Sequence, residues 1–203
     1  MSILQDKMTQ IIGCIELGIP IIITDHPDRE GEGDLMIAAS KATISSLAFF
    51  ARYGRGITCL PCKADRLERL NIPMMYSNKL HKFVTPFSNN IDAANGITTG
   101  VSATDRKVTV DLFVSETSVP EDFAQPGHLY PLRARAGLLT ERQGHTEASV
   151  TLCELANLTP VAVIIEIMCD DGSMMKGQDL VEFGMEHGLL SISIDEIMEF
   201  CEE

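Results

Sequence analysis

The segment 24–35, TDHPDREGEGDL, holds a cluster of carboxylates. Arg29 is the one arginine or lysine in a run of five acidic side chains: Asp25, Asp28, Glu30, Glu32 and Asp34. In an extended chain, residues two apart share a face, so the carboxylates at positions 28, 30, 32 and 34 are expected to point the same way. Aligned carboxylates repel one another unless a cation lies between them, and their oxygens are preferred ligands of Mg²⁺ and Ca²⁺. Two interpretations stay open: a metal site and a solvent-exposed acidic turn.

An EF-hand calcium loop is excluded by the residues that follow the cluster. Asp28, Glu30 and Glu32 fall at the first, third and fifth positions of such a loop, and Gly33 falls at the sixth. The twelfth position, where a bidentate glutamate closes the calcium site, is Ala39, which ends a predicted strand. The cluster is therefore not an EF-hand site.

Two further segments carry polar groups that suit an anion. The segment 98–106, TTGVSATDR, combines hydroxyl groups, a glycine and an arginine, but it lacks the Gly-Lys-Ser/Thr of a phosphate-binding P-loop. The segment 141–149, ERQGHTEAS, places Arg142, His145 and Thr146 at the start of a predicted helix, where backbone N–H groups and the helix dipole favour an anion. A single histidine at that place is also compatible with a helix-start residue of no further function.

Cys59 and Cys62 have the C-x-x-C spacing of redox dithiols and of half a zinc site. A zinc site needs two further ligands at comparable spacing. The remaining cysteines are solitary: Cys14, Cys153, Cys169 and Cys201. The pair ends an apolar run, so burial in the core is the favoured interpretation.

The composition is typical of a globular protein. The chain has 203 residues, of which 45% are hydrophobic and 22% charged, and this length is enough to bury a full core. Its net charge of −13 repels nucleic acid and anionic membranes. The longest apolar run, 11–23, is interrupted by Glu16, Gly18 and Pro20 and is shorter than the roughly 20 residues of a membrane span. No basic segment precedes it and the six cysteines are irregularly spaced, so we expect a cytoplasmic protein with no nucleic-acid or membrane partner.

Apolar periodicity indicates the elements that position these segments in the first half of the chain. The expected elements are helices over 4–15 and 43–54 and strands over 20–24, 35–39 and 56–61. The strand over 20–24 leads directly into the acidic segment, which is a usual place for a site residue. The segment 71–105 is long, polar and without periodicity, which indicates binding loops.

In the second half, strands and helices alternate again. The expected elements are strands over 128–134, 160–168 and 189–194, helices over 146–157 and 176–187, and a last short helix capped by Asp195. The run 160–168, PVAVIIEIM, is apolar enough to be buried on both sides. The regular βαβ rhythm and Gly-rich turn of dinucleotide folds are missing. The predicted fold class is α+β: a single domain over 1–203, with a mixed β-sheet covered by helices in a three-layer α/β/α arrangement.

These segments together resemble one enzyme family, the 3,4-dihydroxy-2-butanone 4-phosphate synthases of riboflavin biosynthesis. The longer matching motifs are DREGEGDL at 28–35, GITTGVSATDR at 96–106, PGHLYPLRA at 126–134 and RQGHTEA at 142–148. The motifs PMM at 73–75 and EIMCDDGSM at 166–174 also match, in the same order. The resemblance covers nearly the whole chain, so chance is a poor explanation of it.

The resemblance implies a lyase that converts ribulose 5-phosphate into 3,4-dihydroxy-2-butanone 4-phosphate and formate. It implies Mg²⁺ or Mn²⁺ as the cofactor, with two ions per site and Glu30 and His145 as protein ligands. It also implies a homodimer with the site at the subunit interface. The sequence contains no cysteine-rich zinc motif like that of GTP cyclohydrolase II, the partner domain in bifunctional relatives, so the monofunctional form is expected.

The resemblance also implies the roles of individual residues. The catalytic residues would be His128, Glu166, Glu32 and Asp34. The substrate-binding residues would be Arg29, Glu30, Asp34, Thr99, Asp105, Arg142, Gln143, Gly144, His145, Thr146 and Glu166. The chemistry agrees with this set, because enolising a ketose and expelling a one-carbon unit pass through oxyanions that a divalent metal stabilises. The accompanying proton transfers need carboxylates and a histidine.

Two departures from the family pattern bear on substrate choice. Gln143 stands where the family usually has a glycine, so a side chain must be accommodated near the expected phosphate. FSNNID at 87–92 replaces the usual Phe-Thr-Val-Ser/Thr strand and is interpreted as a loop that covers the site differently. The alternative function is therefore a metal-dependent enzyme or a binding protein for another sugar phosphate.

Overall fold

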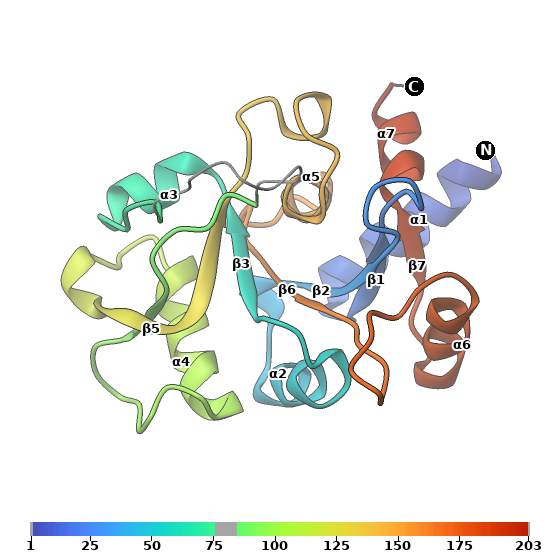
Figure 1. The fold of residues 1–203 in the computed structure, drawn as a ribbon. Helices are drawn as coiled ribbons and strands as arrows, with labels where there is room; N and C mark the ends of the chain where they lie inside the picture. Colours follow the sequence, from blue (N-terminus) through green and yellow to red (C-terminus); the bar gives the residue numbers. More distant parts are fainter. Residues whose placement is uncertain (1, 76–84, 203) are drawn as a thin grey trace.

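The strands form one mixed sheet in the computed structural model, which describes residues 2–75 and 85–202 (Figure 1). Among these residues the sheet has seven strands in the order β4-β5-β3-β6-β2-β1-β7. Their bounds are β1 Ile21–Thr24, β2 Gly33–Ala38, β3 Cys59–Cys62, β4 Ile91–Ala93, β5 Phe123–Arg133, β6 Ala162–Glu166 and β7 Ser191–Ser193. The pairs β1–β7 and β3–β5 are parallel, whereas β1–β2, β2–β6, β3–β6 and β4–β5 are antiparallel. The expected mixed sheet is confirmed.

Helices cover both faces of the sheet (Figure 1). Their bounds are α1 Ile3–Leu17, α2 Ile44–Phe49, α3 Ala64–Arg69, α4 Ala103–Val114, α5 His145–Leu155, α6 Gln178–His187 and α7 Ile194–Glu202. Successive strand residues point to opposite faces. Ile21 and Ile164 therefore pack with α1, α5 and α7, whereas Ile22 and Ile165 pack with α2, α4 and α6. The three-layer arrangement is as expected, and the central strand β6 is buried on both faces from 162 to 165.

Helix ends follow the local sequence signals, with one correction. Gly18 ends α1 in the left-handed region at φ 73°, where a glycine carries no Cβ penalty. Thr43 begins α2 by accepting the Ser46 N–H at 3.0 Å, and α2 continues as a π-helix over Phe50–Gly54. The predicted cap of α7 was wrong: Ser193, not Asp195, accepts the N–H of Glu196, at 3.1 Å.

The segment 71–105 is more ordered than the sequence indicated, at least in its described part. It contains β4, and α4 begins inside it at Ala103. The 3₁₀ turns of the described chain lie outside this segment, at Ala39–Lys41, Pro120–Asp122 and Leu138–Thr140. The interpretation as loops alone was therefore wrong. The buried side chains of α4 are Asp105, Thr109, Val110 and Phe113. Two of these four are polar, so the apolar periodicity that reveals a helix is weak. Positions 76–84 of the expected loop lie outside the described residues.

Cys59 and Cys62 are both buried, on opposite faces of β3, as the core interpretation predicted. Burial raises the pKa of each thiol, so neither thiol ionises readily.

In the described part of the chain, no helix has the length and apolar character that crossing a membrane requires.

Candidate active site

The acidic segment is the loop of a β-hairpin between β1 and β2. Thr24 pairs with Gly33, and the Asp25 N–H donates to the Glu32 carbonyl at 3.2 Å. The Asp25 carboxylate, in a residue only 7% exposed, accepts the N–H groups of Glu32 at 2.8 Å and Glu30 at 3.3 Å. Asp25 therefore stabilises the fold of the loop through hydrogen bonds to its backbone.

The expected alignment of four carboxylates on one face was wrong. A turn occupies positions 27–30, so the chain is not extended there. The Asp28 side chain is 94% exposed beside His26, whereas Asp34 lies buried in β2. Gly31 takes φ 64°, a left-handed conformation in which its glycine identity matters. The loop thus separates the carboxylates, sending Asp28 to solvent and Glu30 and Glu32 towards the interior.

Asp25, Glu30 and His145 bring one donor atom each to within 4.8 Å of one another. The Nε2 atom of His145 is buried and has no hydrogen-bond partner among the described residues. Burial lowers the pKa of His145, which favours the neutral imidazole that binds metals. Two carboxylates and a neutral imidazole aimed at one point fit a divalent cation such as Mg²⁺ or Mn²⁺. The structure therefore brings Glu30 and His145, the two expected ligands, together.

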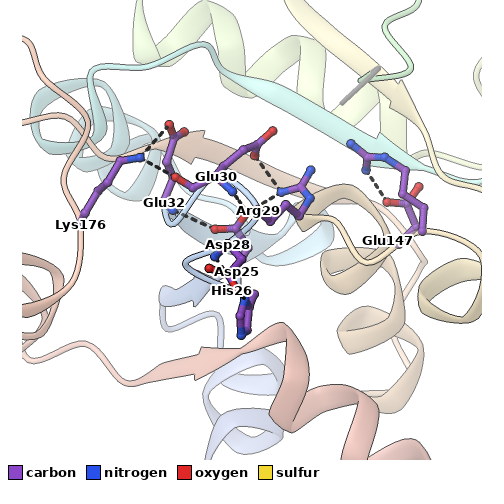
Figure 2. Close-up of polar contacts among 9 residues, drawn as sticks. Asp25, His26, Asp28, Arg29, Glu30, Glu32, Glu147 and Lys176 are labelled. Atoms are coloured by element: carbon purple, nitrogen blue, oxygen red, sulfur yellow. Dashed lines mark hydrogen bonds and ion pairs between the residues drawn. The ribbon is translucent and has the colours of Figure 1, made fainter. Parts of the chain in front are cut away.

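Two basic side chains, Arg29 and Lys176, bind the acidic loop (Figure 2). The Arg29 Nη1 atom lies 2.5 Å from Asp25 Oδ2 and 2.7 Å from Glu30 Oε2. Lys176, just before α6, donates to the Glu30 carbonyl at 2.5 Å and lies 3.9 Å from Glu32 Oε1. A cavity of about 510 Å³ opens between the loop and α6, lined in part by Glu30, Glu32 and Lys176. Small solutes can therefore reach these carboxylates.

Asp34 and Glu166 lie side by side because β2 and β6 are antiparallel and pair Asp34 with Glu166. Burial raises the pKa of Asp34 well above its usual range, and the charge of Glu166 adds to this. Burial also raises the pKa of Glu32, with Glu30 as the next cause. Glu166 Oε2 accepts the Ile57 N–H at 2.7 Å. Gly56 must be a glycine here, since a Cβ would collide with the Glu166 side chain.

Replacing Asp34 with asparagine is expected to stabilise the metal-free protein at neutral pH and to reduce activity. The folded protein holds the Asp34 proton more tightly than the unfolded chain. The contribution of Asp34 to the free energy of unfolding is therefore complete below the unfolded pKa of about 3.9. It is lost as the pH rises through the pKa of Asp34 in the folded protein. Asparagine has no charge to desolvate, so a gain of about 0.5–2 kcal/mol is expected at neutral pH. Urea unfolding of the wild-type protein and of Asp34→Asn, in EDTA at about pH 4 and about pH 8, measures this gain. Equal free energies of unfolding of the two proteins at the higher pH would contradict the prediction.

The start of α5 carries Arg142 and a buried acid. Arg142 Nη1 lies 2.5 Å from Glu147 Oε2, and Glu147 Oε1 accepts the Arg135 N–H at 3.1 Å. The Arg142 guanidinium crosses Gly144 so closely that a Cβ there would collide with it. Gln143 is exposed, so the glycine usual at that position is not required for packing against the described residues. The first turn of α5 thus holds His145 and Thr146, both buried, next to the Arg142–Glu147 pair.

His128 lies in a second group of predicted site residues, across β3 from Glu166. Its ring Nδ1 is 2.6 Å from Asp92 Oδ2 of β4. Gly100 packs against this pair, and the Asp105 carboxylate accepts the backbone N–H groups of Thr98, Thr99 and Gly100. Hydrogen bonds from Thr98 lower the pKa of Asp105 to about 2. Asp105 is therefore occupied in holding the loop, while Thr99 is exposed.

Sequence reasoning missed four residues that shape the site: Asp25, Asp92, Glu147 and Lys176. Asp25 was visible only as one acid among five. Asp92 and Lys176 act on partners 36 and 146 positions away, and no local pattern carries such information. Glu147 lies inside the RQGHTEA motif, in the first turn of the predicted helix. An acidic residue at that place is explained by its favourable interaction with the helix dipole, so it does not indicate a further role.

Comparisons with known proteins agree with this geometry. Residues 9–200 match the family described as 3,4-dihydroxy-2-butanone 4-phosphate synthase. A protein of that name from Chromobacterium violaceum is 40% identical over 201 residues, covering 99% of this chain and 96% of the relative. Another from Neisseria meningitidis serogroup A is 44% identical over 191 residues, covering 94% of this chain but 53% of the relative, so the chain spans about half the length of that protein.

A solved structure has the same fold. It is a 3,4-dihydroxy-2-butanone 4-phosphate synthase in complex with two magnesium ions, 35% identical to this chain, with a TM-score of 0.92 and 96% of each chain covered. The family match spans nearly all of the sequence, and the Chromobacterium relative is matched along nearly its full length. The chain therefore belongs to the 3,4-dihydroxy-2-butanone 4-phosphate synthase family.

Proposed function

We propose that the chain is a cytoplasmic lyase that converts ribulose 5-phosphate into 3,4-dihydroxy-2-butanone 4-phosphate and formate for riboflavin biosynthesis. The observation that carries this proposal is the convergence of Asp25, Glu30 and His145 on one point, beside Asp34 and Glu166. Membership of the family and the relative that binds two magnesium ions support it.

The donor set suits Mg²⁺ or Mn²⁺, two ions per site, with Glu30 and His145 as the proposed protein ligands. When bound, the metal supplies Lewis-acid polarisation of the sugar's carbonyl and hydroxyl oxygens. Asp25 contributes negative charge and keeps the loop folded through its bonds to the Glu30 and Glu32 N–H groups. Lys176 holds the other side of the loop.

The substrate phosphate is proposed to bind at the start of α5. Backbone N–H groups of a helix N-terminus attract anions, and Arg142 adds a guanidinium that suits phosphate oxygens. Gly144, His145 and Thr146 provide the first turn, and Gln143 beside them is exposed and is proposed to contact the anion with its side-chain amide. Arg29 and Thr99 supply further polar contacts, whereas Asp105 acts through the loop that it holds.

The remaining groups are proposed to move protons. Asp34 and Glu32, whose pKa values are raised by burial, hold a proton to a higher pH than ordinary carboxyl groups do and are proposed to pass it to and from the sugar. Glu166 has its Oε2 atom fixed by the Ile57 N–H, which leaves Oε1 to accept a proton from the sugar. His128 is proposed as the further acid–base residue.

A homodimer with His128 acting across the interface is part of the proposal. The His128 side chain is 46% exposed. Two large apolar side chains near it, Ile57 and Val101, are also about half exposed. Arg106 joins their segments by donating to Thr58 Oγ1 at 2.6 Å and to the Val101 carbonyl at 2.9 Å. An apolar rim beside an exposed histidine is what a shared interface provides, and two equivalent sites follow from one two-fold interface.

The alternative is a metal-dependent enzyme or a binding protein for another sugar phosphate, favoured by Gln143 in place of a glycine. Formate release from ribulose 5-phosphate separates the two. We expect formate release in Mg²⁺, its loss in EDTA and its return when Mg²⁺ is restored. Release of formate unchanged by EDTA would contradict the metal assignment. No formate with ribulose 5-phosphate, but turnover or binding of another sugar phosphate, would favour the alternative.

A further inference from the structure

Asp92 holds His128 by two hydrogen bonds at once. Asp92 Oδ1 accepts the His128 backbone N–H at 3.0 Å, and Asp92 Oδ2 lies 2.6 Å from the ring Nδ1. An ionised carboxylate only accepts hydrogen bonds, so the proton in the shorter contact belongs to Nδ1. The neutral ring then carries no proton on Nε2.

The surroundings fix Asp92 in this position. Its side chain is 10% exposed, and β4 shifts register against β5 between Ile91 and Asp92. Asn90 and Gly127 lock this irregular pairing, because the Asn90 side chain donates to the Gly127 carbonyl at 2.7 Å and the Gly127 N–H donates to the Asn90 carbonyl at 3.1 Å. The segment 87–92 is therefore partly paired in the sheet, with Phe87 bridged to Leu132 and Ile91 and Asp92 in β4, so the expectation that it is a loop is corrected.

Gly100 packs closely against the Asp92–His128 pair. A Cβ on Gly100 would collide with both Asp92 and the His128 ring. The nearby charges are Arg106, which donates to Thr58 and to the Val101 carbonyl, and Asp105, which is occupied by the N–H groups of 98–100. Neither side chain has a hydrogen bond to His128 among those the structure describes. The ring orientation therefore depends on Asp92.

We propose that Asp92 is a positioning residue that fixes the tautomer of His128, with the proton on Nδ1 and the lone pair of Nε2 directed away from β4 as the reactive atom. This rests on the proposed function, since it assigns the working nitrogen of a proposed acid–base residue. A carboxylate behind a histidine is a known way to set the tautomer and orientation of the ring and to stabilise its protonated form.

The tautomer can be measured without any turnover. Nitrogen NMR of protein labelled with ¹⁵N-histidine, at a pH where the rings are neutral, distinguishes Nδ1–H from Nε2–H, and the His128 signals are those missing from a His128→Gln sample. We expect Nδ1–H. An Nε2–H signal in the wild-type protein would overturn the proposal, whether or not any variant folds.

Asp92→Asn gives a sharp second test. The His128 backbone N–H still needs an acceptor, so the asparagine oxygen stays at the Oδ1 position and its NH₂ group faces Nδ1. The tautomer should therefore change to Nε2–H. The expected kinetic result is a fall in kcat of about 10- to 100-fold, as for loss of other carboxylates that orient a histidine, with KM nearly unchanged.

Asp111→Asn is the matched control, since it makes the same chemical change at an exposed residue of α4 paired with Lys107. It should keep the wild-type tautomer and kcat. Asp92→Asn protein that is folded but has wild-type kcat would overturn the proposal, as would an unchanged Nδ1–H tautomer. Wild-type protein that releases no formate from ribulose 5-phosphate would instead overturn the proposed function, and the spectrum would still decide the tautomer.

Discussion

Replacing His145 with alanine is expected to abolish formate release while leaving the protein folded. His145 completes the cluster with Asp25 and Glu30, and its buried Nε2 atom has no hydrogen-bond partner among the residues that the structure describes. Losing a residue behind a metal ligand typically costs about 10- to 100-fold in affinity or activity, so loss of a ligand itself should exceed this. Folding should survive, because alanine is a good helix former at the start of α5 and no hydrogen bond of the His145 side chain to another described residue is lost.

Mn²⁺ binding, followed by electron paramagnetic resonance, measures the metal directly, and circular dichroism checks the fold. Glu30→Gln should give the same double loss of metal and activity. His26→Ala is the matched control, since His26 lies exposed in the same loop and its ring accepts only the Asp28 N–H in the described contacts. The metal-site assignment fails if His145→Ala retains wild-type activity and Mn²⁺ affinity.

Mixing two inactive variants is expected to restore activity. If His128 serves the partner's site, a dimer of one His128→Ala subunit and one Glu30→Gln subunit has one site with both groups intact. Equal mixing makes about half of the dimers mixed, so up to about a quarter of wild-type activity should return. The reason is geometric, since in the proposed two-fold dimer each exposed His128 would lie beside the acidic loop of the other chain.

The reciprocal mixture controls for this result. Wild-type subunits mixed with the double variant, His128→Ala with Glu30→Gln, should fall from about half to about a quarter of full activity as subunits exchange, because every mixed dimer then has two incomplete sites. If His128 serves its own chain, that mixture keeps about half and the first mixture recovers nothing. A protein that stays monomeric at assay concentration would reject the shared site.

The elements that position the acidic cluster could be predicted because they carry strong local signals. The run at 160–168 is continuously apolar, as a strand buried on both faces must be, and it became β6. The α5 helix begins within one residue of its predicted start, because apolar residues recur on the face that packs on the sheet. The ends of α1 and α6 followed from Gly18 and Gly188, which take the left-handed conformation.

The contacts that define the site could not be predicted in the same way, because they join distant parts of the chain. Asp34 is an ordinary strand residue until β6 places Glu166 beside it. The helix α4 was missed because it buries Asp105 and Thr109 for hydrogen bonding rather than for apolar contact. The path of the acidic loop depended on the Asp25 carboxylate, whose backbone partners no periodicity reveals.

The sheet order also has a consequence for how the chain folds. The middle strand, β6, pairs with both β2 and β3 but begins only at Ala162 of a chain of 203 residues. Pairings of such long sequence separation are slow to form, and the earlier strands are synthesised well before their partner. The β1–β2 hairpin can form alone, with Asp34 still hydrated. Asp34 and Glu166 come together only when β6 docks, so their repulsion opposes the docking of β6 and not the formation of the hairpin.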